Sequence, residues 1–193
     1  MPILDPADCI LLLLNVTPEP GGQPNDAQFS RRHRLIRAAA LAAAVPVYTA
    51  MRDGWASNEQ KPPEGSRSNG FHSYPSGMIR VLWAERGLAQ TIAGHKRSSL
   101  ILAGCWLEVD ITFLALSALA DGFDAHVLFD ASPSQERDIR QLAIDRILQA
   151  GAVPLSTVQM LHEWAESSGD DARRHALLNL VGSDHSTCAG AGR

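Results

Sequence analysis

Short runs of apolar residues alternate with longer segments of helical periodicity along the chain. The first run, Cys9–Leu14, is continuously apolar and ends at the polar Asn15, which is typical of a strand that is buried on both faces of a parallel sheet. Further apolar runs predict strands, and the segment 81–83 predicts a short strand or a turn. These runs cover residues 47–51, 99–103, 125–129 and 153–155.

The segments between the runs have the periodicity of helices. They cover residues 27–44, 86–93, 108–120, 133–149, 157–166 and 170–180. Strands that alternate with helices in this way form a mostly parallel sheet covered by helices on both faces. The sequence therefore predicts the α/β class, as a three-layer α/β/α domain with a central sheet of about six strands.

The length of 193 residues fits one domain, which we expect to cover residues 1–182. The remaining segment, 183–193, is rich in Gly, Ala and Ser, and we expect a flexible C-terminal tail there. Residues 52–77 have no sustained periodicity and contain several Gly, Pro, Ser and Asn. A loop of this length is usually functional or mobile, so its conformation is expected to shape any pocket.

The composition is that of a globular protein with a substantial core, with 45% hydrophobic residues and a net charge of -4. The cluster of arginines between residues 31 and 37 is interpreted as a solvated helix face, so nucleic acid is not an expected partner. Cys9–Leu14 is too short to span a bilayer, so no membrane is expected either. Three widely spaced cysteines without a CxxC pair favour a reducing cytoplasm.

Ligands of parallel sheets gather at the carboxyl ends of the strands. The residues that follow the predicted strands are Asn15, 52–53, 104–110 and 130–132. The histidines have no metal-ligand spacing. We therefore expect neither a metal nor another cofactor.

A specific resemblance lies between Leu100 and Val158. The segment reads Leu-Ile-Leu-Ala-Gly-Cys-Trp-Leu-Glu-Val-Asp at 100–110, then Asp-Ala-Ser at 130–132 and Gln-Ala-Gly-Ala at 149–152. It resembles the isochorismatase-like cysteine hydrolases, particularly the YcaC-related branch, in which Thr-Glu-Val-Cys opens a helix after Ala-Gly and two residues. The resemblance is strong over about a third of the chain, and elsewhere the first strand and the general layout agree.

The resemblance implies a mechanism with an Asp at the end of the first strand, a Lys, and the Cys that opens the helix. In this chain the matching positions hold Asn15, Gly77 and Asp110. The family also holds the oxyanion with backbone amides near the Cys, beside a non-proline cis peptide that Trp106 would flank. Cys105 lies on the strand side of this turn and does not replace the nucleophile. The thiol mechanism is therefore expected to be lost.

A carboxylate is a poor nucleophile toward amides but a competent general base or acid. Asp110 would lie in the first turn of a helix, which favours its charged form, and Asn15 could donate a hydrogen bond to it. Arg80, three residues beyond the missing Lys, could replace its charge and bind a substrate carboxylate. Each residue also has a simpler interpretation, as a helix cap, a turn residue and a surface side chain.

The side chains around the turn are expected to line the substrate pocket. They are Trp106, Leu107, Val109 and, from the preceding loop, Trp83. For both tryptophans, packing in the core is the simpler alternative.

Two functional hypotheses follow. In the first, the protein is an enzyme, either a hydrolase or a repurposed lyase or isomerase, that acts on a small, anionic metabolite by acid/base or water-activating chemistry centred on Asp110. In the second, it is an inactive family member that binds a ligand or serves as a structural subunit of a homo-oligomer. The apolar helix 111–119 would supply contacts between subunits or belong to the core.

Overall fold

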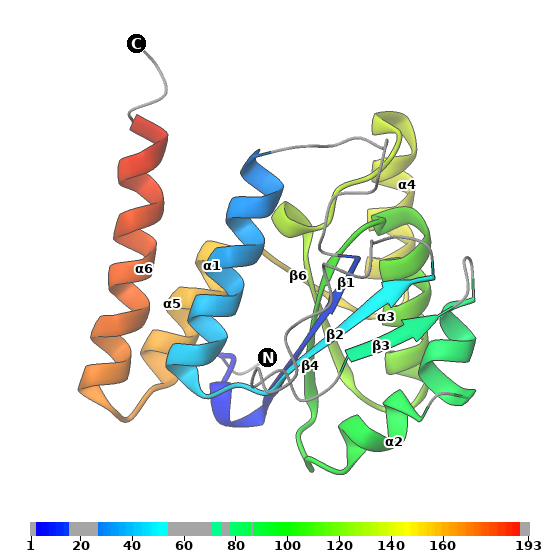
Figure 1. Ribbon diagram of the computed structural model, residues 1–193, viewed down its shortest axis with the longest axis horizontal. Coiled ribbons are helices and arrows are strands. Elements are labelled where there is room, and N and C mark those ends of the chain that lie inside the picture. The colour runs from blue at the N-terminus through cyan, green and yellow to red at the C-terminus, as the bar shows by residue number, and fades with distance from the viewer. Residues whose placement is uncertain (1–2, 16–26, 54–70, 75–77, 86, 190–193) are drawn as a thin grey trace.

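Six parallel strands form one sheet in the order β3-β2-β1-β4-β5-β6 (Figure 1). The computed structural model describes residues 3–15, 27–53, 71–74, 78–85 and 87–189. The strands are β1 (Cys9–Leu14), β2 (Val47–Arg52), β3 (Phe71–Tyr74), β4 (Ser99–Gly104), β5 (Asp124–Leu128) and β6 (Val153–Leu155). The predicted parallel sheet is thus confirmed. Only β3 was missed, since it lies within the segment 52–77 that was predicted to be irregular.

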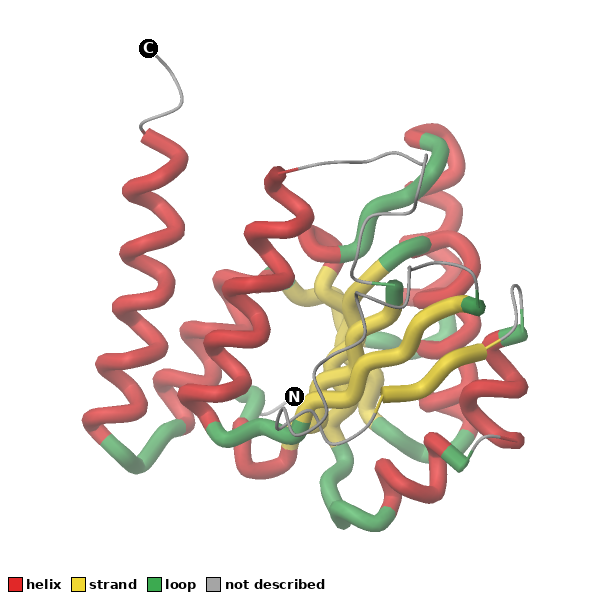
Figure 2. The backbone as a smooth tube through the Cα atoms, in the orientation of Figure 1, coloured by secondary structure: helices red, strands yellow, loops and turns green. Residues whose placement is uncertain are grey.

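Helices cover both faces of the sheet, which confirms the predicted three layers (Figure 2). The helices of the first face are α1 (Ala27–Ala43), α5 (Thr157–Ser167) and α6 (Asp171–Ala189), and those of the second are α2 (Leu88–Ala93), α3 (Thr112–Ala120) and α4 (Arg137–Gln149). Two π-helical turns precede helices of the second face, η3 (Val81–Glu85) and η4 (Leu107–Ile111). The alternative of a strand at 81–83 is therefore wrong.

The central strand β1 is buried on both of its faces. Ile10, Leu12 and Leu14 pack in the core under α2, α3 and α4. Leu11 and Leu13 pack in the other core, under α1, α5 and α6. Because neither face of β1 meets solvent, every position of the strand is apolar, and this explains the continuous apolar run in the sequence.

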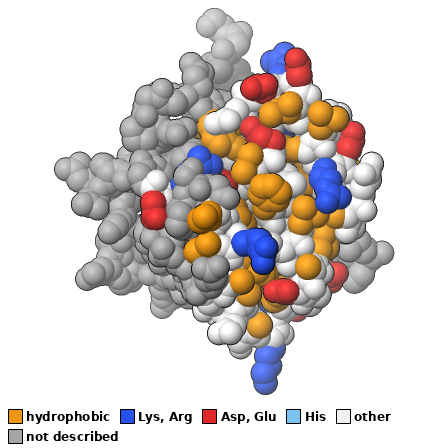
Figure 3. Space-filling view, turned by 90° about the vertical axis from the view of Figure 1, so that its right-hand side faces the viewer, with side chains coloured by type: hydrophobic (Ala, Val, Ile, Leu, Met, Phe, Trp, Pro, Cys, Tyr) orange, Lys and Arg blue, Asp and Glu red, His pale blue; other side chains and the backbone are white. Residues whose placement is uncertain are grey.

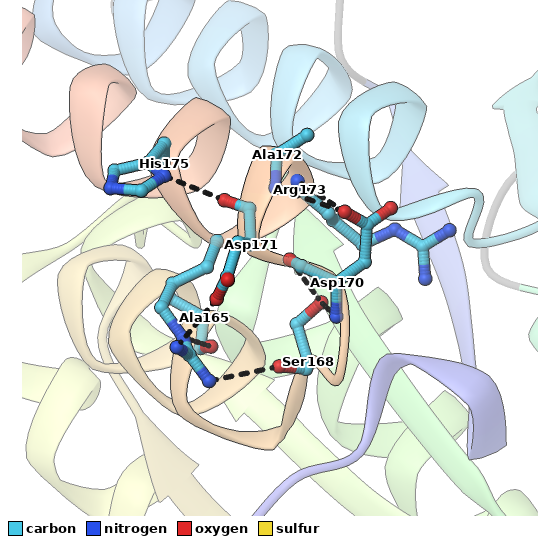
Figure 4. A network of polar contacts seen from close by, with 8 residues as sticks. Ala165, Ser168, Asp170, Asp171, Ala172, Arg173 and His175 are labelled. Atoms are coloured by element: carbon cyan, nitrogen blue, oxygen red, sulfur yellow. Dashed lines mark hydrogen bonds and ion pairs between the residues drawn. The ribbon is translucent and has the colours of Figure 1, made fainter.

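The corner between α5 and α6 is held by local polar contacts (Figure 4). Asp170 accepts hydrogen bonds from the backbone of Ala172 at 2.9 Å, which satisfies a free N–H in the first turn of α6. Arg174 reaches back and donates to the carbonyls of Ala165 and Ser168. The helix then continues to Ala189, beyond the predicted domain end at residue 182, so residues 183–189 are helical.

None of the helices in the described ranges is long and apolar enough to cross a membrane.

Candidate active site

The strands β1 and β4 end side by side at the carboxyl edge of the sheet, where Leu14 pairs with Gly104. A Cβ atom at Gly104 would lie 1.8 Å from the carbonyl oxygen of Leu14, and the φ of Gly104 is +135°. Only glycine fits this position. The close approach brings the next residues of the two strands, Asn15 and Cys105, together.

Asn15 connects three parts of the site. Its Nδ2 donates hydrogen bonds to the carbonyl oxygen of Cys105 at 2.7 Å and to Oδ2 of Asp110 at 2.8 Å. Its Oδ1 accepts a hydrogen bond from the backbone N–H of Arg52 at 2.8 Å. The residue is fully buried and has a φ of 47°, a left-handed conformation that Asn tolerates better than most residues. The hydrogen bond predicted from Asn15 to Asp110 is therefore present.

Asp110 lies in the turn η4, as the sequence predicted for the first turn of a helix. The turn begins after a cis peptide bond between Cys105 and Trp106, which the resemblance also implied. The backbone N–H of Leu107 donates to Pro133, and that of Ile111 to Trp106, so the turn is fixed at both ends. The Asp110 side chain is fully buried.

Arg52, the last residue of β2, supplies the positive charge of the site. Its Nη2 lies 2.6 Å from Oδ2 of Asp110, and its side chain is 17% exposed. The sequence analysis placed Arg52 at a strand end but expected the charge from Arg80. The side chain of Arg80 is exposed, and it is Arg52 that contacts Asp110. The separation of Arg52 and Arg80 along the sequence could not show which of them contacts Asp110, because the segment between β2 and η3 is long.

Two N–H donors therefore contact the same oxygen of a buried carboxylate. Charge-assisted hydrogen bonds of this kind stabilise the ionised form, because a proton on Oδ2 would compete with both donors. The site therefore favours the ionised form of Asp110 over the carboxylic acid. The charges of Asp110 and Arg52 cancel.

The residues predicted to line the pocket differ in their surroundings. Trp106 is buried and packs with Phe29 and Cys105 in a small apolar cluster beside the site. Val109 is partly buried, and its N–H makes a long hydrogen bond of 3.4 Å to Trp106. Leu107 is fully buried in the core under α3, so its side chain is placed in the core packing.

Trp83 lies at the other edge of the sheet. Its Nε1 donates to Oδ2 of Asp121 at 2.8 Å, and its ring packs edge-on against Phe123 at 5.9 Å. Both partners lie between the end of α3 and the amino end of β5. The structure therefore does not bring Trp83 together with Asp110, and its contacts are those of the alternative, packing in the core.

His33, on α1, was missed by the sequence analysis. It is buried, its ring packs against Phe29 at 4.1 Å, and its Nε2 donates to the carbonyl of Ala131 at 2.9 Å. Burial lowers the pKa of His33 to about 4, so the ring is neutral. The four-residue spacing from Phe29 on the inner face of α1 was the available signal.

The contacts of Asp130 and the burial of Cys9 assign both residues a structural role. Asp130 accepts hydrogen bonds from the N–H and hydroxyl of Thr157 at the start of α5. Burial raises the pKa of the Cys9 thiol to about 12, which makes it unreactive. Within the described part of the chain, no three His, Cys, Asp or Glu side chains are grouped to hold a metal ion.

The part of the chain that contains Asp110 is similar in sequence to known proteins. Residues 81–159, which include η4 and Asp110, match the isochorismatase domain. The chain is 39% identical over 70 residues to the probable hydrolase YcaC of Escherichia coli. It is 32% identical over 75 residues to the secreted isochorismatase effector Isc1 of Phytophthora sojae. These matches cover 36% and 39% of this chain, and only 34% and 36% of the relatives' own lengths, about a third in each case.

Solved structures agree over nearly the whole chain. The Escherichia coli YcaC gene product is described as an octameric hydrolase of unknown specificity. It superposes on this chain with a TM-score of 0.75 at 22% identity, and the match covers 97% of this chain and 95% of the YcaC chain. The MAR1 ribonuclease of Caenorhabditis elegans superposes with a TM-score of 0.74 at 18% identity, covering 92% and 91%. At these identities the likeness shows the fold. Residues 81–159 are therefore similar to an isochorismatase domain, part of the chain is similar in sequence to YcaC, and the chain has the fold of these solved structures.

Proposed function

We propose that this protein is an isochorismatase-family enzyme that hydrolyses a small molecule without a thiol. The carboxylate of Asp110 would act as the base that activates water. One observation carries the proposal: a buried carboxylate occupies the position at which the resemblance implies the nucleophile, held by Arg52 and Asn15. The homology to a probable hydrolase supports the reaction class.

The contacts of Asp110 favour a base over an acid. Both donors form their strongest hydrogen bonds with the ionised carboxylate, so the protonated form that an acid needs is disfavoured at this site. A base needs the ionised form, which the site already stabilises. The same donors weaken the base, because they lower its affinity for a proton. We therefore expect slow turnover.

The charges of the site favour a neutral substrate. The prediction of an anionic substrate relied on Arg80 as a cation available to the substrate. Among the residues that the structure describes, the cation beside Asp110 is Arg52, and its charge is compensated by Asp110 at 2.6 Å. An incoming carboxylate would have to displace a buried carboxylate from this pair, which is costly. An uncharged amide, ester or vinyl ether would not have to displace this carboxylate.

The second hypothesis, an inactive ligand-binding or structural subunit, is favoured by a different observation. Asp110 is 0% exposed, and its Oδ2 is already bonded to two side chains. Under this hypothesis the carboxylate serves to join β1, β2 and η4. In that case the site would retain its shape but would have no catalytic activity.

A screen for hydrolysis separates the two hypotheses. The wild-type chain and a variant with Cys9, Cys105 and Cys188 replaced by alanine are each incubated with three neutral probes, 4-nitrophenyl acetate, nicotinamide and ethyl vinyl ether, after unfolding curves confirm that the variant is folded. The proposal expects hydrolysis of at least one probe, and the same probe should be hydrolysed by the variant. Activity that disappears in the variant would contradict a thiol-independent reaction, and no hydrolysis of any probe would favour the inactive subunit.

We also propose that the protein assembles with copies of itself and acts in the cytoplasm. The octameric assembly of YcaC supports the first of these proposals. The free, buried thiol of Cys9 is compatible with a reducing compartment.

A further inference from the structure

A cavity of about 480 Å³ lies at the carboxyl ends of β5 and β6, apart from the candidate active site at the ends of β1 and β4. Its size is within the range of ligand cavities in proteins, about 300–1,000 Å³. The lining residues come from the turn η5 (Phe129–Ala131), from β6 and from the starts of α4 and α5. They include Phe129, Asp130, Arg140, Pro154, Leu155 and Gln159.

Arg140, on α4, is a partly buried cation that lines this cavity. Its Nη1 donates to the carbonyl oxygen of Ser132 at 2.7 Å, and its Nη2 donates to that of Phe129 at 2.6 Å. These bonds fix the guanidinium beside the cavity. The guanidinium has further N–H donors, and a carbonyl oxygen does not neutralise its charge. In the described part of the chain, no carboxylate forms an ion pair with Arg140.

Asp130, the other charged residue among those that line the cavity, already has its own partners. Its Oδ2 lies 3.3 Å from Nε of Arg32, and its Oδ1 accepts hydrogen bonds from the N–H and the hydroxyl of Thr157. The charges of Asp130 and Arg32 cancel, so the charge of Arg140 remains. The start of α5 also borders the cavity, and the helix dipole adds positive potential there.

Exposed apolar side chains elsewhere do not identify a ligand in this way. Figure 3 shows hydrophobic side chains that lie among Lys, Arg, Asp and Glu side chains, on the side of the molecule where α3 and α4 lie in Figure 1. A mixed surface of this kind is ordinary, because apolar atoms supply much of the surface of any folded protein. A cation in a cavity without a counter-charge is more informative, because its partial burial is costly until an anion compensates it.

The other walls of the cavity indicate the class of anion. Phe129, Pro154 and Leu155 provide an apolar surface beside Arg140. One cation beside an apolar surface matches a ligand that has a single carboxylate and an apolar body. A phosphate group carries about −1.5 to −2 charges at pH 7, which one cation would compensate only in part.

We propose that this cavity binds a small organic monocarboxylate, whose carboxylate contacts Arg140 and whose apolar body lies against Phe129, Pro154 and Leu155. The proposed site includes none of the residues Asn15, Arg52 and Asp110. It therefore goes beyond the proposed hydrolytic reaction and does not depend on it.

Isothermal titration calorimetry with benzoate as the probe tests the site. At low ionic strength, wild type should bind benzoate more tightly than benzyl alcohol, which lacks the charge, and more tightly than acetate, which lacks the ring. Arg140→Gln removes the cation and should weaken benzoate binding at least about tenfold. Arg137→Gln removes the same charge at an exposed position of α4 outside the cavity, so its affinity should stay within about twofold of wild type.

Gln159→Glu is a second variant, and it leaves the hydrogen bonds of Arg140 in place. The Oε1 atom of Gln159 accepts hydrogen bonds from the N–H and the hydroxyl of Ser156, and a glutamate can accept the same bonds in this capping box. The added negative charge borders the cavity and should weaken benzoate binding at least about threefold. Gln90→Glu adds the same charge at an exposed position of α2 and should leave the affinity unchanged.

Unfolding curves first confirm that each variant is folded, and Gln159→Glu decides the question if Arg140→Gln is not. No benzoate binding by wild type would overturn the proposal, as would an affinity that either folded variant leaves unchanged. Equal affinities for benzoate and benzyl alcohol would contradict the role of the charge. Inorganic phosphate that binds more tightly than benzoate would contradict the assignment to a carboxylate. The probe screen for hydrolysis is a separate measurement, so either proposal can fail without the other.

Discussion

Nη2 of Arg52 lies 2.6 Å from Oδ2 of Asp110, a carboxylate that is fully buried. The pair joins the end of β2 to the turn η4, and Asn15 at the end of β1 donates to the same oxygen. These contacts make the site a neutral, hydrogen-bonded unit at the carboxyl edge of the sheet. They also make its stability sensitive to single substitutions.

Arg52→Ala should destabilise the protein, because it leaves the charge of Asp110 buried without its cation. Removing one partner of a buried ion pair costs about 3–5 kcal/mol, and the partial exposure of Arg52 places the expected loss near the lower value. Urea unfolding measures this loss. The double variant Arg52→Met with Asp110→Leu should lose less, since it leaves neither charge. A loss below about 0.5 kcal/mol for Arg52→Ala would mean that the pair contributes little.

Asn15→Asp should also destabilise the protein. It replaces the Nδ2 donor with a second carboxylate oxygen that faces Asp110 and the carbonyl of Cys105. The expected loss is at least about 1–3 kcal/mol at pH 7, and it should decrease in acid as one carboxylate is protonated. Asn179→Asp, at an exposed position of α6, is the matched control and should change stability by less than about 0.5 kcal/mol. Equal losses for the two variants would contradict the role of Asn15.

Gly104→Ala should disrupt the junction between β1 and β4, because its Cβ atom would lie 1.8 Å from the carbonyl oxygen of Leu14. Gly122→Ala is the control, since its φ is also positive, at +86°, but no atom lies within 4 Å of the added Cβ. We expect the control to lose about 1–2 kcal/mol from backbone strain and Gly104→Ala to lose clearly more. Thermal or urea unfolding of both variants measures the difference. Similar losses would show that the close approach is relieved at little cost.

The sequence predicted the parts of this structure that depend on local patterns. The continuous apolar run Cys9–Leu14 predicted a central strand, and the positions taken from the family resemblance placed Asn15 beside Asp110. The short strand Phe71–Tyr74 was missed, because it contains polar residues and is held by its pairing with β2, which is a tertiary contact.

The positions of Arg80 and Trp83 could not be predicted from the sequence for the same physical reason. Arg52 lies at the end of β2, and Arg80 lies three residues beyond the position of the missing lysine. Only the fold decides which of these two arginines reaches Asp110. Trp83 follows an irregular segment, so its direction depends on how η3 packs, and Asp121 holds it at the amino edge of the sheet. Contacts between residues that are distant in sequence are not encoded in a local pattern.

The stability of the protein should fall between pH 7 and pH 5 because of His33. Burial lowers the pKa of His33 to about 4, below the ordinary value of 6.5, so the unfolded chain binds a proton in this window and the folded chain does not. The stabilisation is present above the unfolded value and is lost as the pH falls, by about 2 kcal/mol at pH 5. Burial lowers the pKa of His126 as well, which acts in the same direction.

Urea unfolding of wild type and His33→Leu at the two pH values measures this effect. The variant keeps a buried side chain that does not titrate, so its stability should depend less on pH. His162→Leu, at an exposed position, is the control and should keep the pH dependence of wild type. A pH dependence of His33→Leu equal to that of wild type would contradict a neutral, buried His33.

The central claim, that chemistry at this site depends on the carboxylate of Asp110 and not on a thiol, is tested by comparing kcat/KM of two variants. The substrate is the probe that wild type hydrolyses fastest, and unfolding curves first confirm that both variants are folded. Asp110→Asn should lose at least about 100-fold, the usual contribution of a general base. Cys105→Ser should stay within about twofold of wild type, because that side chain is buried beside Phe29 and Trp106. Full activity of Asp110→Asn, or a large loss in Cys105→Ser, would contradict the claim.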